Sequence, residues 1–351
     1  MKLKNDDSKV VGVLTGGGDC PGLNPAIRAV VLKARSMGWK VYGFHDGWAG
    51  VVDRDFEELT EISVADILHE GGTMLGTSRT DPRKDDKAYS SVVTMFSELS
   101  IDALIAIGGD DTLSVASRLA SEGLPVVGVP KTMDNDLQAT DFCIGFDSAV
   151  NRVTQSIDNL RTTARSHHRV MVVEVMGRDA GWVAVVAGMA AGADYIVIPE
   201  VAVSIDEIVE SLERERAKED RHRIVVISEG ANVAGINEVS EQVDDRDQFG
   251  HISLASRDLG HTLAQAIEKA TGMETRVAVL GHTQRGGAPT AFDRVLGSRL
   301  GVRAVEMVRR RKWGHMPALD GRIITEVPIS DAVASNRKVD LELFEIARAL
   351  F

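Results

Sequence analysis

Short apolar runs, most of them rich in valine and isoleucine, alternate along this chain with stretches whose apolar residues recur at helical spacing. Ile27, Val30, Val31 and Ala34, for example, lie on one face of a helix. The apolar runs predict buried strands over residues 10–15, 40–44, 103–107, 126–129, 169–175, 195–198, 223–227 and 277–280. Strands that are apolar throughout and alternate with helices are typical of parallel sheets covered on both faces. The pattern therefore predicts an α/β fold with mostly parallel sheets.

One helix start is specified by polar residues. Ser204 and Glu207 have the spacing of a capping box, in which each side chain bonds the other residue's backbone N–H. One apolar face follows, made of Ile205, Ile208, Val209 and Leu212. We interpret the charge run at residues 214–223 as a solvated helix end, which is the usual place of such runs.

The length of 351 residues corresponds to about two domains. The sequence has no internal repeat, low-complexity tract or proline-rich linker. Short connections must therefore cross any domain boundary. The segments near residues 142–148 and near Gly281 are the candidates.

Composition and charge exclude several classes of protein. Hydrophobic residues make up 44% of the chain, which is enough for a core. Forty basic and 52 acidic residues give a net charge of −12, which argues against nucleic acid as a partner. The apolar run Val183–Ala191 is much shorter than the roughly 18 residues of a membrane span. The charged N-terminus has no apolar signal segment, and the only cysteines are Cys20 and Cys143, so we expect a cytoplasmic protein without disulfides or membrane association.

Three loops in the first half of the chain end predicted strands with glycines, carboxylates or both: residues 16–19, 108–111 and 131–136. Ligands of open parallel sheets bind beyond the carboxyl ends of the strands. Glycines let backbone amides approach an anion there, and carboxylates beside a phosphate fit a bridging Mg²⁺. One such loop alone would be read as a tight turn. Three together favour a phosphate site with Mg²⁺.

The second half supplies positive charge near predicted strand ends, from Arg169, Arg178, Arg276, His282 and Arg285. Guanidinium groups bind phosphate in a bidentate fork, although each arginine alone would more often form a surface ion pair. Residues 281–287, GHTQRGG, place a histidine, an arginine and two glycines before a helix. We therefore expect a phosphorylated substrate as well as a phosphoryl donor.

The motifs together resemble the phosphofructokinase family. They are GGGDCPGLNPAIR (16–28), GGTMLGTSR (71–79), GGDDT (108–112), PKTMDND (130–136), VMGRDAGW (175–182), SEG (228–230), ETR (274–276) and LGHTQRGGAPTAFDR (280–294). The resemblance implies two Rossmann-like three-layer domains. Residues 1–145 with about 284–334 would bind the phosphoryl donor, and residues 146–283 with about 335–351 the sugar phosphate.

The resemblance also implies a role for each matched residue. Asp134 would be the catalytic base that takes the proton of the sugar 1-hydroxyl, and Asp110 the Mg²⁺ carboxylate. Arg79 and Arg178 would neutralise the transferring group, and the amide of Gly18 would hold the donor phosphate. The sugar would contact Thr132, Met133, Met176, Gly177 and Glu229. The 6-phosphate would be clamped by Arg169, Arg276, His282 and Arg285. Thr283 and Gln284, in the same turn as the last two, would also bind the substrate.

In that family the residues matched by Arg169 and Arg276 reach in from a neighbouring subunit. The resemblance therefore implies a homodimer or homotetramer with shared active sites.

Two positions bear on the donor. ATP-using members of the family typically have glycine where this chain has Asp111 and Lys131. The carboxylate of Asp111 would repel and crowd a phosphate of ATP, whereas Lys131 offers a cation to a compact diphosphate. Both substitutions match the diphosphate-dependent branch, which implies fructose 6-phosphate and diphosphate as substrates.

Other interpretations stay open at this point. An ATP-dependent 6-phosphofructokinase would share every matched residue except Asp111 and Lys131. Other kinases with a GGD motif would lack HTQRGG and MGR, and a non-catalytic regulatory subunit would have lost the base or the clamp, which are both present. A nucleotide-binding dehydrogenase is disfavoured because residues 16–18 lack the G-x-G-x-x-G spacing.

Overall fold

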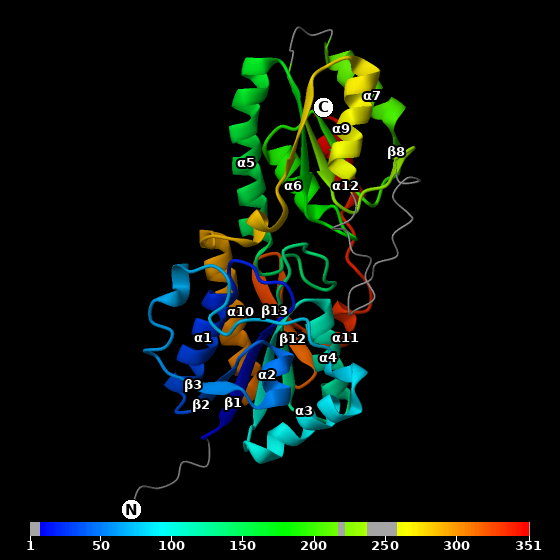
Figure 1. The fold of residues 1–351 in the computed structure, drawn as a ribbon. Coiled ribbons are helices and arrows are strands. Elements are labelled where there is room, and N and C mark those ends of the chain that lie inside the picture. The colour runs from blue at the N-terminus through cyan, green and yellow to red at the C-terminus, as the bar shows by residue number, and fades with distance from the viewer. Residues whose placement is uncertain (1–7, 217–221, 237–257, 351) are drawn as a thin grey trace, which may run out of the picture. The chain divides into compact units, whose positions relative to one another are not determined.

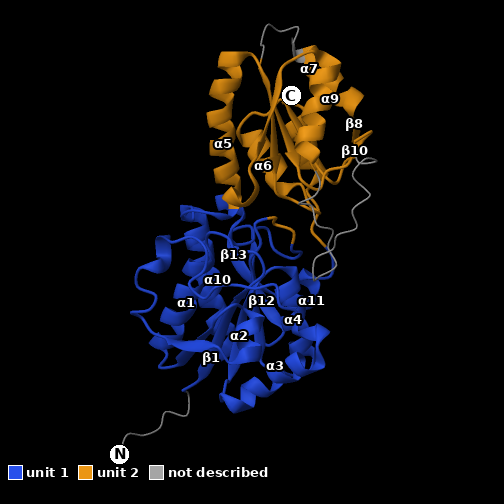
Figure 2. Cartoon of the chain, viewed as in Figure 1, with its two compact units in different colours: residues 1–133, 137–148, 285–335 blue, residues 134–136, 149–284, 336–351 orange. Residues whose placement is uncertain are grey.

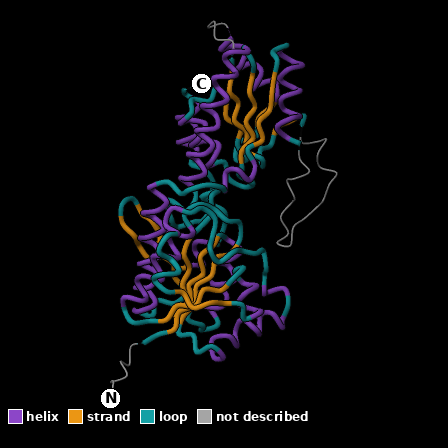
Figure 3. Tube along the Cα trace, turned by 60° about the vertical axis from the view of Figure 1, so that its left-hand side comes forward, coloured by secondary structure: helices purple, strands orange, loops and turns teal. Residues whose placement is uncertain are grey.

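The computed structural model describes residues 8–216, 222–236 and 258–350 (Figure 1). The chain divides into two compact units, coloured separately in Figure 2. Unit 1 consists of residues 1–133, 137–148 and 285–335, and unit 2 of residues 134–136, 149–284 and 336–351. In each unit the strands gather in a central layer with helices on either side (Figure 3).

Unit 1 contains a five-stranded sheet with the order β3-β2-β1-β4-β5. Its strands are β1 (Val10–Gly16), β2 (Lys40–Phe44), β3 (Phe56–Leu59), β4 (Ala103–Gly108) and β5 (Val126–Pro130). All neighbours are parallel except β3, which pairs antiparallel with β2. From β1 the chain first builds toward β3 and then returns to add β4 on the other side, so the topological switch point lies between β1 and β4.

Helices and a hairpin complete unit 1. They are α1 (Leu23–Ser36), α2 (Trp48–Asp53), α3 (Asp86–Glu98), α4 (Asp110–Ser121), α10 (Ala291–Arg309), α11 (Ile329–Ala332), and the antiparallel strands β12 (His315–Asp320) and β13 (Ile323–Pro328). Two short 3₁₀ turns, η1 (Ile67–His69) and η2 (Pro82–Lys84), precede α3. α10 packs closely on α1 because Gly297 and Gly301 have no side chains: a methyl group at Gly301 would lie 2.6 Å from the carbonyl oxygen of Ala26.

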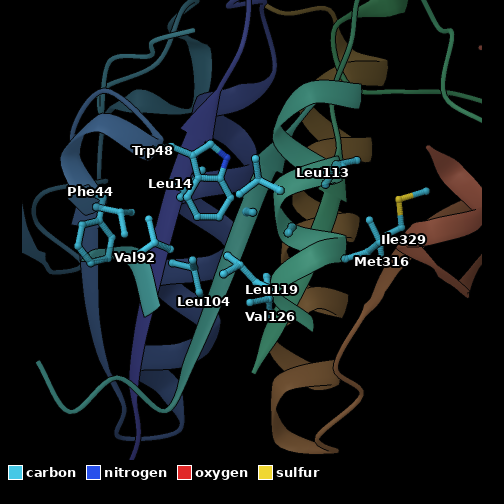
Figure 4. Close-up of a cluster of buried hydrophobic side chains, with 14 of the residues drawn as sticks. Leu14, Phe44, Trp48, Val92, Leu104, Leu113, Leu119, Val126, Met316 and Ile329 are labelled. Carbon is cyan, nitrogen blue, oxygen red and sulfur yellow. The ribbon is translucent and has the colours of Figure 1, made fainter. Parts of the chain in front are cut away.

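The core of unit 1 lies between one face of the sheet and α2, α3 and α4 (Figure 4). Leu14, Leu104 and Val126 come from the sheet and are fully buried. Leu113 and Leu119 of α4 pack against them, and Trp48 and Met316 extend the cluster. The apolar face of each helix is thus paired with strands that are apolar throughout, which explains the sequence pattern.

Unit 2 contains a four-stranded parallel sheet with the order β11-β6-β9-β7. Its strands are β6 (Val170–Val175), β7 (Tyr195–Val197), β9 (Arg223–Ser228) and β11 (Thr275–Val279), and β8 (Val203–Ser204) pairs with β10 (Val233–Ala234). Its helices are α5 (Phe146–His167, which starts in unit 1), α6 (Trp182–Ala190), α7 (Ile205–Arg216), α9 (Leu259–Thr271) and α12 (Leu341–Arg348). Its core includes Val172, Val225, Ile208 and Leu263.

The predicted α/β class and the predicted strands are confirmed, with β11 starting two residues before the expected 277. The capping box at α7 is confirmed as well: Ser204 N donates to Glu207 Oε2 at 3.0 Å, and Glu207 N donates to Ser204 Oγ at 3.2 Å. The antiparallel strands β3, β12 and β13 were not predicted.

The interpretation of the charge run at 214–223 is wrong at its last residue. Arg223 is only 2% exposed, because it begins β9 and lies within the sheet. Residues 217–221 of the run lie outside the described residues. Within the described parts of the chain, no helix is long and apolar enough to span a membrane.

Candidate active site

The loop after β1 is held close to the first turn of α4. Gly16 lies opposite Gly108 in the register of β1 and β4, on either side of the switch point. Thr112 of α4 packs on both: a methyl group at Gly16 would lie 2.5 Å from Thr112 Oγ1, and one at Gly108 would lie 2.4 Å from Thr112 Cβ. The two glycines are thus needed for space, because each lets Thr112 pack directly on its strand end.

A second segment, residues 71–79, is hydrogen-bonded along this loop. Gly17, which has a φ of +78°, donates from its N–H to Ser78 O at 3.2 Å. Thr77 Oγ1 donates to Gly17 O at 2.5 Å, and Thr15 Oγ1 donates to Gly76 O at 2.8 Å. The segment that carries Arg79 therefore follows the donor loop predicted at residues 16–18.

Two cations meet at Gly18. Lys131, the first residue after β5, is 2% exposed, and its Nζ donates to Gly18 O at 2.6 Å. The guanidinium of Arg285 lies against the same glycine, where a methyl group would be 1.8 Å from Nη1. Lys131 is thus placed at the predicted donor loop, and so is Arg285, which the resemblance assigns to the sugar phosphate.

Asp110 and Asp111 lie in the first turn of α4, directly after Gly109. The pKa of the nearby Arg83 is raised mainly by its hydrogen bond to Asp81, and the charges of Asp111 and Asp110 raise it further. Among the described residues, no group of three or more histidine, cysteine, aspartate or glutamate side chains could hold a metal ion. Mg²⁺ in phosphoryl-transfer sites typically uses one or two carboxylates plus substrate phosphates and water, and Asp110 at a helix N-terminus beside the glycine loops fits such a ligand.

In unit 2, three loops meet at the carboxyl ends of β6, β9 and β11. Ser228 Oγ donates to Gly177 O at 2.6 Å, and Glu229 N donates to Val175 O at 2.8 Å. Met176 N donates to Gln284 Oε1 at 3.2 Å. Five predicted sugar-site residues are thereby brought to one edge of the sheet: Met176, Gly177, Arg178, Glu229 and Gln284.

Glycines allow this close approach. Gly177 has a φ of +134°, which few other residues tolerate. A methyl group at Gly230 would lie 1.8 Å from Arg178 O, so the backbone of the loop after β9 lies against that of Arg178. The position of Arg178 therefore depends on two residues without side chains.

The 3₁₀ turn η4 (Gly281–Arg285) follows β11. Gln284 is fully buried, and its Nε2 donates to Gly281 O at 3.0 Å while its Oε1 accepts from Met176. Its amide thus joins two loops inside unit 2. Thr283 Oγ1 bonds Leu280 O, whereas His282 is exposed at the surface of the unit.

Arg169 and Arg276 lie at the other end of this sheet. Arg169 immediately precedes β6, and Arg276 is the second residue of the neighbouring β11. Arg169 Nε lies 2.8 Å from Glu274 Oε2, and Arg276 pairs with Oε1 of the same carboxylate. The hydrogen bond from Arg169 holds the pKa of Glu274 below its ordinary value, and Arg276 adds to this effect. At about 3.3 Å per residue, a strand such as β6 separates this pair from Met176 by roughly 20 Å.

Thr132, Met133 and Asp134 follow Lys131 on the segment that passes from unit 1 to unit 2. Lys131 forms an isolated parallel bridge with Ile144, which fixes the start of the segment. Met133 is 4% exposed, and Asn135 has a left-handed backbone with a φ of +53°. Asp134 therefore lies between a buried methionine and a tight turn.

A buried carboxylate, Asp293, was not predicted as a separate feature. It is fully buried, and it accepts hydrogen bonds from Gly145 N at 2.9 Å, Ser148 N at 2.8 Å and Ser148 Oγ at 2.6 Å. Its own N–H donates to Thr290, the N-cap of α10. One carboxylate thus joins the N-termini of α5 and α10. Burial raises the pKa of Asp293 to about 6 although these hydrogen bonds act in the opposite direction.

Glu274 and Thr112 were also missed as individual residues. Glu274 lies in the motif ETR and Thr112 in the motif GGDDT, so the sequence contained a signal for both. The partner of each becomes visible only in the fold: the arginine pair for Glu274, and two glycines from different strands for Thr112.

Comparison with known proteins gives consistent results. Residues 10–308 match the family model described as phosphofructokinase. The pyrophosphate–fructose 6-phosphate 1-phosphotransferase of Amycolatopsis methanolica is 49% identical over 97% of this chain and 99% of that protein. The ATP-dependent 6-phosphofructokinase of Corynebacterium efficiens is 46% identical over 97% and 98%. The T-state phosphofructokinase structure from Pichia pastoris aligns with a TM-score of 0.82 at 34% identity, covering 98% of this chain and 39% of that one.

Proposed function

The chain belongs to the phosphofructokinase family, and from this premise we propose that it transfers a phosphoryl group from diphosphate to fructose 6-phosphate. The acceptor would be the 1-hydroxyl, and the products fructose 1,6-bisphosphate and phosphate. The reaction would be reversible, because a phosphoanhydride without a nucleotide is exchanged for a phosphate ester.

The donor assignment depends on one observation, the position of Lys131. Relatives named for either donor have similar identities, 49% and 46%, so overall similarity separates the two donors little. Lys131, however, is buried at the glycine loop and donates to Gly18 O. An ammonium group there supports the binding of a small, highly charged anion. Asp111, in the first turn of α4, would repel the additional phosphate of ATP.

The chemical step follows from the predicted roles. Asp134 would accept the proton of the 1-hydroxyl as that oxygen attacks the terminal phosphorus of diphosphate. The bond between this phosphorus and the bridging oxygen then breaks, and inorganic phosphate leaves. Arg79 and Arg178 would neutralise charge on the transferring group. A Mg²⁺ ion held by Asp110 would supply further neutralisation of the phosphate oxygens.

We also propose that the active sites are shared between subunits. Arg169 and Arg276 lie at the amino ends of their strands, whereas Met176, Arg178 and Glu229 follow the carboxyl ends. These two groups lie at opposite ends of one sheet, so they could not hold the same sugar phosphate within one chain. The arginine pair would therefore complete the site of another copy, in a homodimer or homotetramer.

The decisive experiment compares donors on the purified protein. Fructose 6-phosphate and Mg²⁺ are supplied with either diphosphate or ATP, and kcat/KM is measured for each donor. We expect diphosphate to be much the better donor, and fructose 1,6-bisphosphate with phosphate to be converted back. An Asp134→Asn preparation, purified identically, controls for contaminating kinases. A higher kcat/KM with ATP would overturn the proposal in favour of an ATP-dependent 6-phosphofructokinase.

A further inference from the structure

Arg337 is hydrogen-bonded to the short loop that carries the predicted base. Its backbone N–H donates to Asp136 O at 2.7 Å, and Asp136 follows Asp134 by two residues. Between them, Asn135 makes a tight turn with a φ of +53°. Arg337 and this loop both belong to unit 2. The C-terminal part of unit 2 therefore fixes the end of the loop in which Asp134 lies.

One tryptophan holds Arg337 at two points. Trp182, the first residue of α6, is only 7% exposed. Its indole Nε1 donates to Arg337 O at 3.1 Å, and the guanidinium carbon of Arg337 lies 4.4 Å from the centroid of the same indole. The first contact satisfies the polar end of a buried tryptophan, and the second lies within cation–π distance. Because both the backbone and the side chain of Arg337 are held, Trp182 also restrains the N–H that bonds Asp136.

Residues 337–339 are bonded to the loop of Arg178 as well. Val339 N donates to Glu200 Oε1 at 2.9 Å. The same carboxylate oxygen accepts from Gly181 N at 3.0 Å. Glu200 thus joins the C-terminal segment to the stretch of chain between Arg178 and α6.

Residues 337–339 therefore connect two parts of the candidate site that lie far apart in the sequence. Lys338 Nζ donates to Asp179 O, the carbonyl of the residue after Arg178. The loop of Arg178 and the loop of the predicted base Asp134 are thus held to one stretch of three residues. All of these contacts lie within unit 2.

We propose that Trp182 and Arg337 are positioning residues, which hold Asp134 in place to take the proton of the sugar hydroxyl. The inference rests on the function proposed above, and neither residue is assigned a contact with the substrate. A general base acts only within hydrogen-bond reach of the proton that it takes. A small displacement of the base therefore costs turnover, while substrate binding is retained. The indole N–H and the guanidinium should thus affect kcat, with little effect on the KM for fructose 6-phosphate.

Steady-state kinetics of Trp182→Phe test the role of the indole. Phenylalanine keeps an aromatic ring but removes the N–H that bonds Arg337 O. We expect kcat to fall about 3- to 10-fold, with the KM for fructose 6-phosphate within about twofold of the wild-type value. Trp48→Phe is the matched control: Trp48 is buried in the core of unit 1, and its Nε1 has no hydrogen-bond partner among the described residues. Its kcat should equal that of the wild type, and thermal unfolding checks the fold of each variant.

Substitutions of Arg337 test the partner of the indole. Arg337→Met removes the guanidinium over the ring, whereas Arg337→Lys keeps a cation there. We expect Arg337→Met to lower kcat and Arg337→Lys to retain more of it. The double variant Trp182→Phe with Arg337→Met should be little worse than the weaker of the two single variants, because both act through the one contact with Asp136.

A third comparison is made in the Asp134→Asn background. Without its carboxylate there is no base left to position, so Trp182→Phe should change the residual kcat by less than about twofold. Single-turnover measurements at high enzyme concentration give this residual rate. A purely structural defect would instead lower the rate by the same factor with and without the base.

Four results would overturn the proposal. They are a wild-type kcat in folded Trp182→Phe, a raised KM with unchanged kcat in that variant, full additivity in the double variant, and an equal loss in the Asp134→Asn background. If Trp182→Phe does not fold, a wild-type kcat in Arg337→Met overturns it.

Failure of the proposed function has a different outcome. Wild-type turnover in Asp134→Asn alone would refute the assigned base, and this inference with it. If ATP proves the better donor, the same variants are compared with ATP, because the base acts on the acceptor hydroxyl with either donor.

Discussion

Arg169 lies 2.8 Å from the carboxylate of Glu274, at the amino ends of two neighbouring strands of unit 2. The same carboxylate also pairs with Arg276. Two guanidinium groups so close together repel each other unless an anion lies between them. Glu274 therefore keeps the arginine pair together in the absence of substrate.

Replacing this carboxylate should weaken sugar-phosphate binding. Glu274→Gln retains one acceptor oxygen, which can orient one guanidinium but not balance both charges. We expect KM for fructose 6-phosphate to rise about threefold to tenfold with little change in kcat, since exposed ion pairs make modest contributions. Glu345→Gln is the matched control, because it removes another exposed ion pair, that with Arg348 on α12. A lowered KM in Glu274→Gln would mean that the carboxylate competes with the phosphate.

Complementation between inactive subunits tests the shared site. Arg276→Ala subunits keep the base, and Asp134→Asn subunits keep the arginine pair. A mixed dimer would contain one site with both intact, so about half of its sites should be active. Two affinity tags isolate the mixed oligomer, whose activity is compared with that of each parent. Failure of an isolated mixed oligomer to exceed its parents would contradict sharing.

Replacing Asp134 by the uncharged asparagine tests its role as the catalytic base. Asp134→Asn should retain fructose 6-phosphate binding and lose about 10²- to 10⁴-fold in kcat, the usual contribution of a general base. Asp141→Asn, in the same part of the chain, removes a carboxylate that bonds Gly321 N and should leave kcat within about twofold. Turnover near that of the wild type in Asp134→Asn would exclude the assigned role.

Substitutions of Asp111 and Lys131, the two residues expected to select the donor, should change the preference for diphosphate over ATP through different donors. Lys131→Gly removes the ammonium at Gly18 and should lower kcat/KM for diphosphate at least about tenfold, with a smaller effect on ATP. Asp111→Gly should raise kcat/KM for ATP relative to diphosphate. Asp110→Gly controls for general damage at α4: because Mg²⁺ is needed with either donor, it should reduce both activities alike. Equal losses for both donors in Lys131→Gly would argue against a role in selection.

Asp293 makes stability depend on pH. Burial raises its pKa from 3.8 to about 6, so between these values the folded protein keeps a proton that the unfolded chain has lost. The free energy of unfolding should therefore fall as pH rises through this window, by up to about 3 kcal/mol. Urea titrations of the wild type and Asp293→Asn from pH 4 to 7 measure the effect. The difference between wild type and variant should shrink with rising pH, and a constant difference would contradict the raised pKa.

The sequence predicted strands and the capped helix well because each depends on local patterns. β2 (Lys40–Phe44) has the expected bounds, and the Ser204–Glu207 cap involves residues three apart. β12 and β13 were missed, since their side chains are only partly apolar and they stabilise each other as a hairpin. Arg223 was misread because a charge at the start of a buried strand looks like the end of the charged run before it.

The motifs predicted the segments of the candidate site, but they did not predict which residues those segments' side chains contact. Nothing local in the sequence relates Arg285 to Gly18, because 267 residues separate them and the fold alone brings them together. Asp293 is similar: its partners Gly145 and Ser148 lie on a different helix start, more than a hundred residues away. Such pairs are set by topology, and neither periodicity nor spacing encodes them.

Unit 1 is assembled from separate stretches of the chain, and its close contact between α1 and α10 joins two of them. A protease that cuts once between residues 149 and 284 would leave β1, β4, β5 and α1 on one fragment and α10 with β12 on the other. The close packing of α10 on α1, which Gly297 and Gly301 allow, would still hold these fragments together. Nicked protein should therefore elute from a sizing column as intact material and separate into two bands only under denaturing conditions.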